Sequence, residues 1–278
     1  MIDNLKVVEH YSPHGLVKML QSALAQSGLQ NSIVPVEKLA MLDQFHVLGF
    51  QATVELAALC NISPQTKVLD IGSGLGGASR YLAKNFGCHV TGIDLSPEFV
   101  EASRYLTRRT GLEANAKFEV ADAINMPFEN ETFDLAWTQH VAMNIEDRSA
   151  LYAEIRRILK PDGRLAIFDI VKGKNDEIVF PMPWAATKAT SFLLGFEEMQ
   201  KVLLQAHFEI IHWKDKTAEA LEWMQQQNAQ MNQQTSLPSL SLPAIMGKEF
   251  MKAGANMVSA LKEGRAGLVQ AIVSNKHT

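Results

Sequence analysis

The residues at 68–77 read VLDIGSGLGG, an apolar run that ends in a cluster of glycines. Gly72, Gly74 and Gly77 have the spacing GxGxxG, in which glycine lets the backbone turn sharply and approach a ligand closely. Asp94 follows Gly74 by 20 residues, a position from which a carboxylate can accept hydrogen bonds from both ribose hydroxyls of an adenosine. These two features predict an adenosine cofactor and leave open which one.

Two other aspartates narrow the choice of cofactor. Asp70 precedes the glycines, where its carboxylate would repel a pyrophosphate and attract an ammonium, directly or through water. Asp122 lies in the sequence VADA at 120–123, where its carboxylate or the neighbouring amides could bond the amino group and a ring nitrogen of adenine. S-adenosyl-L-methionine has an amino acid end and no phosphate. We therefore predict S-adenosyl-L-methionine as the cofactor, with S-adenosyl-L-homocysteine as its product.

Alternating strands and helices must hold these residues in place. From residue 67 onward, short apolar runs bounded by turn signals alternate with segments of helical periodicity, a pattern typical of βαβ units and a doubly wound parallel sheet. Pro161 and Gly163 are placed as a type I turn prefers, between a helix and the next strand. We expect strands at 67–71, 88–93, 116–120, 133–138, 164–171, 208–213 and 267–274, and helices at 77–85, 96–110, 148–159, 197–206, 218–234 and 244–262.

Five stretches, in this order, resemble the successive motifs of class I S-adenosylmethionine-dependent methyltransferases. They are VLDIGSGLGG, GIDLS, VADAINMPF, FDLAWTQH and LKPDGRLAIFDI, and they cover about residues 66–171. The resemblance implies an α/β fold, a Rossmann-like doubly wound sheet of seven strands in the order 3-2-1-4-5-7-6, with strand 7 antiparallel. Together with the chemistry above, it places these residues at the cofactor: Asp70, Gly72, Ser73, Gly74, Asp94, Leu95, Asp122, Ala123 and Gln139.

The remaining segments divide the chain around this core. Residues 1–65 have helical periodicity, and we expect them to form an N-terminal helical cap or lid. Residues 66–278 then form the methyltransferase domain, with inserts at about 172–195 and 216–263. The first insert is rich in proline and aromatic residues, a composition typical of a loop that crosses the end of a sheet.

A second resemblance concerns the substrate. The stretch VEHYS at 8–12 and the stretch LDQFH at 42–46 look like the amino-terminal segments of sarcosine/dimethylglycine and phosphoethanolamine N-methyltransferases. The insert at 181–185 and the segment at 256–265 look closer to the sarcosine/dimethylglycine group. This resemblance implies a small-molecule acceptor, with an amine nitrogen preferred. Related sequences also methylate sugars, quinones, sterols and other natural products, so methylation of oxygen or carbon stays open.

Five residues are candidates for the acceptor side of the site. His140 follows a predicted strand and could act as a base, orient the acceptor, or serve only structurally. Tyr11 resembles a tyrosine that closes over cofactor and substrate in related enzymes, and His46 is either a pocket residue or a neighbour of a helix cap. Trp184 could present its ring to a cationic amine or could pack. We take His140, Tyr11 and His46 as catalytic candidates, and Asn144 and Trp184 as substrate-binding candidates.

Composition favours a small-molecule partner. Apolar residues make up 47% and charged residues 20% of the 278 residues, values that argue against extended disorder. The net charge is -4 and no dense basic run occurs, so we expect no nucleic-acid or membrane partner.

The two cysteines and the scattered histidines lack metal-ligand spacing, so we expect no metal. The given sequence shows neither the pattern of a secretory signal nor a long apolar stretch, so we expect a cytoplasmic protein.

Two other classes of protein compete with the methyltransferase prediction. An NAD-dependent oxidoreductase would share the glycine spacing and the acid after the second strand, but Asp70 and Asp122 argue against it. A non-catalytic scaffold could keep the fold as a platform for a partner protein, although the intact glycine loop speaks against a decayed site. The helices expected at 1–65 and 216–263 offer surfaces for a homodimer.

Overall fold

The computed structural model describes residues 15–175, 177–233, 240–241, 245 and 248–276. Its sheet has seven strands in the order β3-β2-β1-β4-β5-β7-β6, and β7 runs antiparallel to both of its neighbours. The fold class, the strand order and the direction of strand 7 are therefore confirmed. The strands are β1 Lys67–Ile71, β2 His89–Asp94, β3 Ala116–Val120, β4 Phe133–Gln139, β5 Leu159–Lys172, β6 Glu209–Asp215 and β7 Ala266–Ser274.

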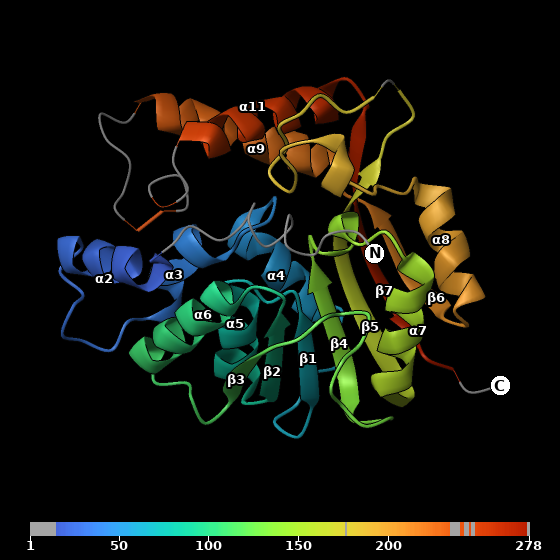
Figure 1. Cartoon of the computed structure of the whole chain (residues 1–278), viewed down its shortest axis with the longest axis horizontal. Helices are drawn as coiled ribbons and strands as arrows, with labels where there is room; N and C mark the ends of the chain where they lie inside the picture. The colour runs from blue at the N-terminus through green and yellow to red at the C-terminus, as the bar shows by residue number, and fades with distance from the viewer. Residues whose placement is uncertain (1–14, 176, 234–239, 242–244, 246–247, 277–278) are drawn as a thin grey trace.

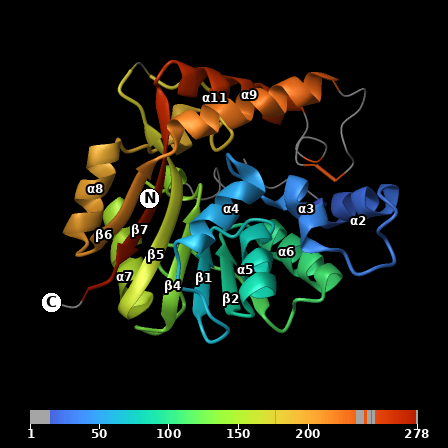
Figure 2. The ribbon, with the colours of Figure 1, turned by 180° about the vertical axis from the view of Figure 1, so that it is seen from behind.

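Helices lie on both faces of this sheet (Figures 1 and 2). Side chains of each strand point alternately to the two faces. Val68 and Trp137 therefore pack on the side of α4 and α5, and Leu69 and Ala136 pack on the side of α7 and α8. The helices are α2 Leu16–Gln26, α3 Val36–Asp43, α4 Gly49–Ala58, α5 Gly77–Phe86, α6 Pro97–Thr110, α7 Arg148–Ile158, α8 Phe196–Gln205, α9 Thr217–Gln233 and α11 Lys248–Lys262, with short 3-10 helices at Ala142–Asn144 and Lys188–Thr190.

The turn at 160–163 differs from the prediction. A type I turn needs a φ near -90° at its third residue, whereas Asp162 has a φ of 59°, the value that suits a type II turn. The segment also pairs with a residue near the end of the chain, since Asp162 N donates to Asn275 O and Asn275 N donates to Gly163 O. The type I prediction is therefore wrong, and β5 continues through this segment.

The segments outside the core gather at one end of the sheet. The glycine loop follows β1, the insert follows β5, and α9 begins just after β6, so all three lie at the edge where the parallel strands end. Figures 1 and 2 show α9 and α11 side by side across this edge. None of the helices in the described ranges combines the length and the hydropathy needed to cross a lipid bilayer. The division at residue 65 stays a prediction.

Candidate cofactor and acceptor site

A cavity of about 1040 Å³ lies where β1, β2 and β4 end. It is at the upper end of the range for small-molecule sites, about 300–1,000 Å³. Tyr11 lies outside the described residues. The other predicted site residues all line this cavity: His46, Asp70, Gly72, Ser73, Gly74, Asp94, Leu95, Asp122, Ala123, Gln139, His140, Asn144 and Trp184.

The glycine loop is tied to the end of β2 by its own backbone. Gly72 and Gly74 have φ values of 67° and 51°, which L side chains rarely adopt. A Cβ at Gly72 would also lie 2.6 Å from Val141 Cγ2. Gly74 N donates to Asp94 Oδ2, and Ser96 N donates to Asp94 Oδ1, both at 2.9 Å. Asp94 is therefore held in one orientation at the cavity, with lone pairs left for a ligand's hydroxyls.

Asp70 is buried beneath the loop. Asp70 is only 3% exposed, and its Oδ2 accepts a hydrogen bond from Ser79 Oγ at 2.6 Å. Burial raises the pKa of Asp70 to about 7, with a smaller contribution from the nearby charge of Asp94. A cation brought into the cavity would favour the ionised carboxylate. The site therefore suits an ammonium better than an anion.

The far side of the glycine loop offers a polar group next to an apolar wall. Asp122 Oδ1 accepts a hydrogen bond from Ile124 N at 3.1 Å. Leu95, Phe99 and Ala123 line the cavity beside it. A flat heterocycle with hydrogen-bonding edges can use both features, since its faces need apolar contact and its edges need polar partners.

A buried ion pair that the sequence analysis missed also holds the glycine loop. Arg80 Nη2 lies 2.7 Å from Asp43 Oδ2, and both side chains are 0% exposed. The same nitrogen donates to Leu75 O in the loop, and Nη1 donates to Thr107 Oγ1 at 3.1 Å. Arg80 thus joins α3, the glycine loop and α6. The sequence offered one signal of this buried pair, namely an arginine within the apolar periodicity of the helix predicted at 77–85.

Asp43 also faces the cavity. Its Oδ1 is buried and has no hydrogen-bond partner among the residues that the structure describes. Burial raises the pKa of Asp43 to about 6, although the charge of Arg80 opposes this rise. Asp43 is therefore a second buried carboxylate, beside Asp70, in the lining of the cavity.

Gln139 presents an amide nitrogen to the cavity. Trp137 Nε1 donates to Gln139 Oε1 at 2.9 Å, and Thr53 Oγ1 lies 3.2 Å from the same oxygen. Because an indole N–H can only donate, the amide oxygen must face Trp137 and the amide nitrogen must face away from it. Within the described ranges this buried nitrogen has no acceptor. A ligand oxygen in the cavity would satisfy it.

Two histidines meet in the cavity. The ring of His140 stacks on Phe168 with a centroid distance of 5.6 Å, and the ring of His46 lies 5.9 Å from that of His140. Burial lowers the pKa of His46 to about 4. Burial, together with His46, lowers the pKa of His140 well below its usual range. Both rings are therefore neutral near pH 7 and can orient a ligand, but they are weak bases.

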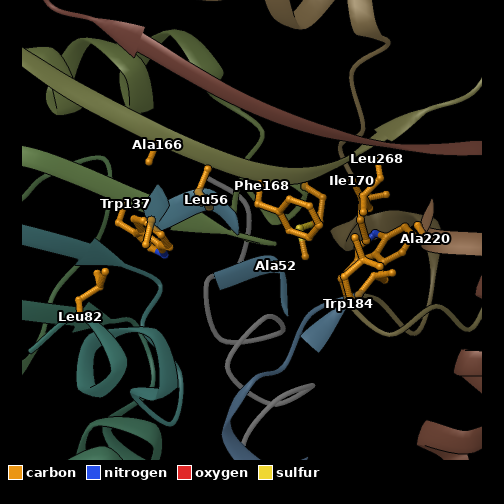
Figure 3. Packing of buried hydrophobic residues seen from close by; sticks show 14 of the residues in the cluster. Ala52, Leu56, Leu82, Trp137, Ala166, Phe168, Ile170, Trp184, Ala220 and Leu268 are labelled. Atoms are coloured by element: carbon orange, nitrogen blue, oxygen red, sulfur yellow. The ribbon is translucent and has the colours of Figure 1, made fainter. Parts of the chain in front are cut away.

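The insert closes one side of the cavity. Asn144 Nδ2 donates to Trp184 O at 2.8 Å and to Thr190 O at 2.9 Å. Trp184 is 1% exposed, its Nε1 donates to Ser191 Oγ at 2.9 Å, and it packs beside Ile170 (Figure 3). The structure thus favours packing for Trp184, while its place in the cavity lining keeps substrate contact a prediction. Asn144 positions the insert.

Comparisons with known proteins agree with this geometry. Residues 69–167 match the family model of a methyltransferase domain. Over 114 residues, 41% of this chain, the sequence is 39% identical to the glycine/sarcosine/dimethylglycine N-methyltransferase of Actinopolyspora halophila. Over 186 residues, 66% of this chain, it is 32% identical to the phosphoethanolamine N-methyltransferase of Triticum aestivum. These matches span only 20% and 36% of the two relatives.

The fold is shared with a solved structure. Phosphoethanolamine N-methyltransferase 2 of Haemonchus contortus, in complex with S-adenosyl-L-methionine, has a TM-score of 0.74 and 18% identity, over 96% of this chain and 61% of that one. At this identity the likeness concerns the fold alone. Taken together, the comparisons confirm the resemblance that the sequence motifs predicted.

Proposed function

We propose that this chain, whose residues 69–167 match the model of a methyltransferase domain, binds S-adenosyl-L-methionine and transfers its methyl group to an amine nitrogen of a small molecule. One observation carries the proposal. Asp70, Asp94 and Asp122 lie in one cavity at the ends of three neighbouring strands, around a glycine loop that Asp94 itself holds. This set of groups suits an adenosine with an ammonium-bearing tail and no phosphate.

The groups that line the cavity fit the parts of this cofactor. Asp94 would accept hydrogen bonds from the ribose hydroxyls, and Asp122 with its neighbouring amides would hold the edge of the adenine. Asp70 would face the ammonium, and the unsatisfied Nε2 of Gln139 would donate to an oxygen of the methionine carboxylate. Ser73 and Leu95 line the space between these groups.

Methyl transfer requires the protein to align the acceptor with the methyl group more than it requires an acid or a base. When bound, the cofactor supplies an electrophilic methyl group on a sulfonium. The protein must place the acceptor nitrogen in line with that methyl group and exclude competing water. His140 Nε2, which is buried without a partner inside the described ranges, would orient the acceptor by one hydrogen bond. We keep Tyr11 and His46 as further candidates for this task.

The neutral histidines support nitrogen over oxygen as the acceptor atom. An amine that reaches the site unprotonated needs no further proton removal before attack, whereas a hydroxyl generally needs a base. The lowered pKa values of His46 and His140 make both rings poor bases. A free amine is therefore the acceptor that this site can use with the groups it contains.

Calorimetry with S-adenosyl-L-homocysteine tests cofactor binding. We expect the wild-type chain to bind it, and Asp94→Ala to bind at least about 100-fold more weakly, because two hydrogen bonds to a charged group are lost. Glu101→Ala, an exposed acid on α6, is the matched control and should bind like the wild type. An absence of binding at millimolar ligand, or a thermal shift with NAD and none with S-adenosyl-L-methionine, would overturn the proposal.

Release of S-adenosyl-L-homocysteine tests the acceptor atom. We expect primary, secondary or tertiary amines to be methylated, and we expect phenols and sugars of similar size to be inactive. Turnover of hydroxyl compounds alone would contradict the preference for nitrogen while leaving the methyltransferase proposal intact.

A further inference from the structure

We infer that the acceptor amine carries no carboxylate or phosphate group. The inference rests on the proposed function and concerns the acceptor half of the same cavity, which we define by His46, His140, Met143, Asn144, Ile170 and Trp184. It separates this chain from enzymes whose acceptors are amino acids or phosphorylated amines, because those acceptors bring an anion into the site.

Within the described part of the chain, the lysine, arginine, aspartate and glutamate side chains that line the cavity are of one sign. Among its described lining residues six are acidic and none is Lys or Arg. Two of the acids, Glu146 and Asp147, are exposed and stand near the acceptor half, one residue beyond the 3-10 helix that carries Asn144. A carboxylate or phosphate bound there would be repelled by these groups and would lose its hydration without compensation.

The buried cations of the described chain are committed elsewhere. Arg80 pairs with Asp43, Lys216 pairs with Glu55 and Glu219, and Arg265 pairs with Glu263. Arg148 donates to Phe192 O at 2.9 Å, which fixes the insert. Each of these four cations lies outside the cavity lining, so none is in place to receive an anion.

The two histidines do not supply the missing charge. Their pKa values are lowered by burial, so that each ring is neutral near pH 7. Around them the wall is apolar at Met143 and Ile170. Such a wall accepts hydrocarbon, hydroxyl, ester or amide substituents, and the acids attract an ammonium. An amine without an anionic group thus matches the acceptor half, and an anionic one does not.

Matched acceptor pairs test the inference. Ethanolamine is compared with phosphoethanolamine, sarcosinamide with sarcosine, and dimethylglycine methyl ester with dimethylglycine. For each pair we measure kcat/KM by release of S-adenosyl-L-homocysteine, and binding by calorimetry with S-adenosyl-L-homocysteine present. We expect the member without the anion to be favoured at least about tenfold. Equal or better use of the anionic members would overturn the inference.

A reversed charge in the wall sharpens the test. Ile145 lines the cavity and is half-buried, so that Ile145→Lys can place an ammonium at the acceptor half, and Ile145→Met is the neutral control. We expect Ile145→Lys to shift the ratio of each pair toward the anionic member by about tenfold, and Ile145→Met to leave it unchanged. A ratio unaffected by the lysine would assign the preference to shape and would overturn the charge argument.

Failure of the inference is distinguishable from failure of the proposed function. If the wild type does not bind S-adenosyl-L-homocysteine, the proposed function fails. If it binds this ligand and prefers the anionic acceptors, only the inference fails.

Discussion

The proposed cofactor half of the cavity, which we define by Asp70, Gly72, Gly74, Asp94 and Asp122, and the proposed acceptor half are held by different kinds of contact. In the cofactor half, Asp94 accepts from the backbone of Gly74, and Asp70 accepts from Ser79 in the next helix. These partners belong to a single βαβ unit. In the acceptor half, His46, His140 and the insert with Trp184 come from three segments that are distant along the chain.

The difference concerns charge as well as connectivity. Carboxylates define the cofactor half, and the buried groups of the acceptor half are neutral rings, amides and apolar side chains. A cofactor of fixed structure can be bound by charged groups that lie close together along the chain. An acceptor, in contrast, is selected by side chains from separate segments. The predictions below test whether each half depends on the contacts assigned to it.

The largest expected effect comes from the ion pair beneath the cofactor half. Arg80→Met removes one partner of a fully buried pair and should lower the free energy of unfolding by about 3–5 kcal/mol. The double variant Asp43→Leu/Arg80→Met should recover part of this loss, because no charge is left buried. Denaturant unfolding measures both. Both variants should bind S-adenosyl-L-homocysteine more weakly than the wild type, since the glycine loop has lost its contact at Leu75. The double variant should not recover this affinity. Full recovery of that affinity in the double variant would contradict a role in holding the loop.

The next effect concerns the charge of Asp70. The pKa of Asp70 is raised to about 7, so the carboxylate is mainly ionised above that pH and mainly protonated below it. Binding of S-adenosyl-L-methionine should therefore weaken as the pH falls through about 7. Asp70→Asn should bind about tenfold more weakly at about pH 8 and should lose this part of the pH dependence. Calorimetry across this range decides, and parallel profiles for the two proteins would exclude Asp70 as the titrating group.

The cofactor half was largely predictable because its signals are local. Glycine spacing, a strand before it and acids at strand ends predicted Asp70, Gly72, Gly74, Asp94 and Asp122 for one site, and the family resemblance added Leu95, Ala123 and Gln139. Six of the seven strands lie within two residues of their predicted bounds, and β5 begins five residues earlier than predicted. The strand order itself was implied only by the family resemblance. Trp137 and Gln139 could have been paired from the sequence, since residues two apart on a strand share a face.

Contacts between segments distant along the chain could not be predicted from the sequence. Asp43 and Arg80 are 37 residues apart, and no local pattern predicts their pairing. The backbone of Asp162 and Gly163 pairs with Asn275, near the end of the chain. The acceptor half is built from such contacts, and this is why the neutrality of its wall could be described only from the structure.

A smaller effect is expected where the two halves meet. Trp137→Phe removes the indole donor that fixes Gln139, so the amide can rotate and its nitrogen no longer has to face the cavity. We expect binding of S-adenosyl-L-homocysteine to weaken by about threefold to tenfold, on the order of 1 kcal/mol. Gln139→Ala and the double variant complete a cycle. The double variant should bind no worse than Gln139→Ala alone, and additive losses would show that Trp137 acts independently of Gln139.

The smallest effect tests the neutrality of the acceptor half without any ligand. The pKa of His46 falls from 6.5 to about 4 in the folded protein, so between these values the unfolded chain binds more protons than the folded one. The contribution of His46 to stability should therefore fall as the pH falls from about 6.5 toward 4, and the free energy of unfolding of the wild type relative to His46→Gln should fall by on the order of 1 kcal/mol over this range. His89→Gln, at an exposed position at the start of β2, is the control. If denaturant unfolding gave His46→Gln the same pH slope as the control, His46 would have the same pKa in the folded and the unfolded chain, and the acceptor half would gain a cation as the pH falls below about 6.5.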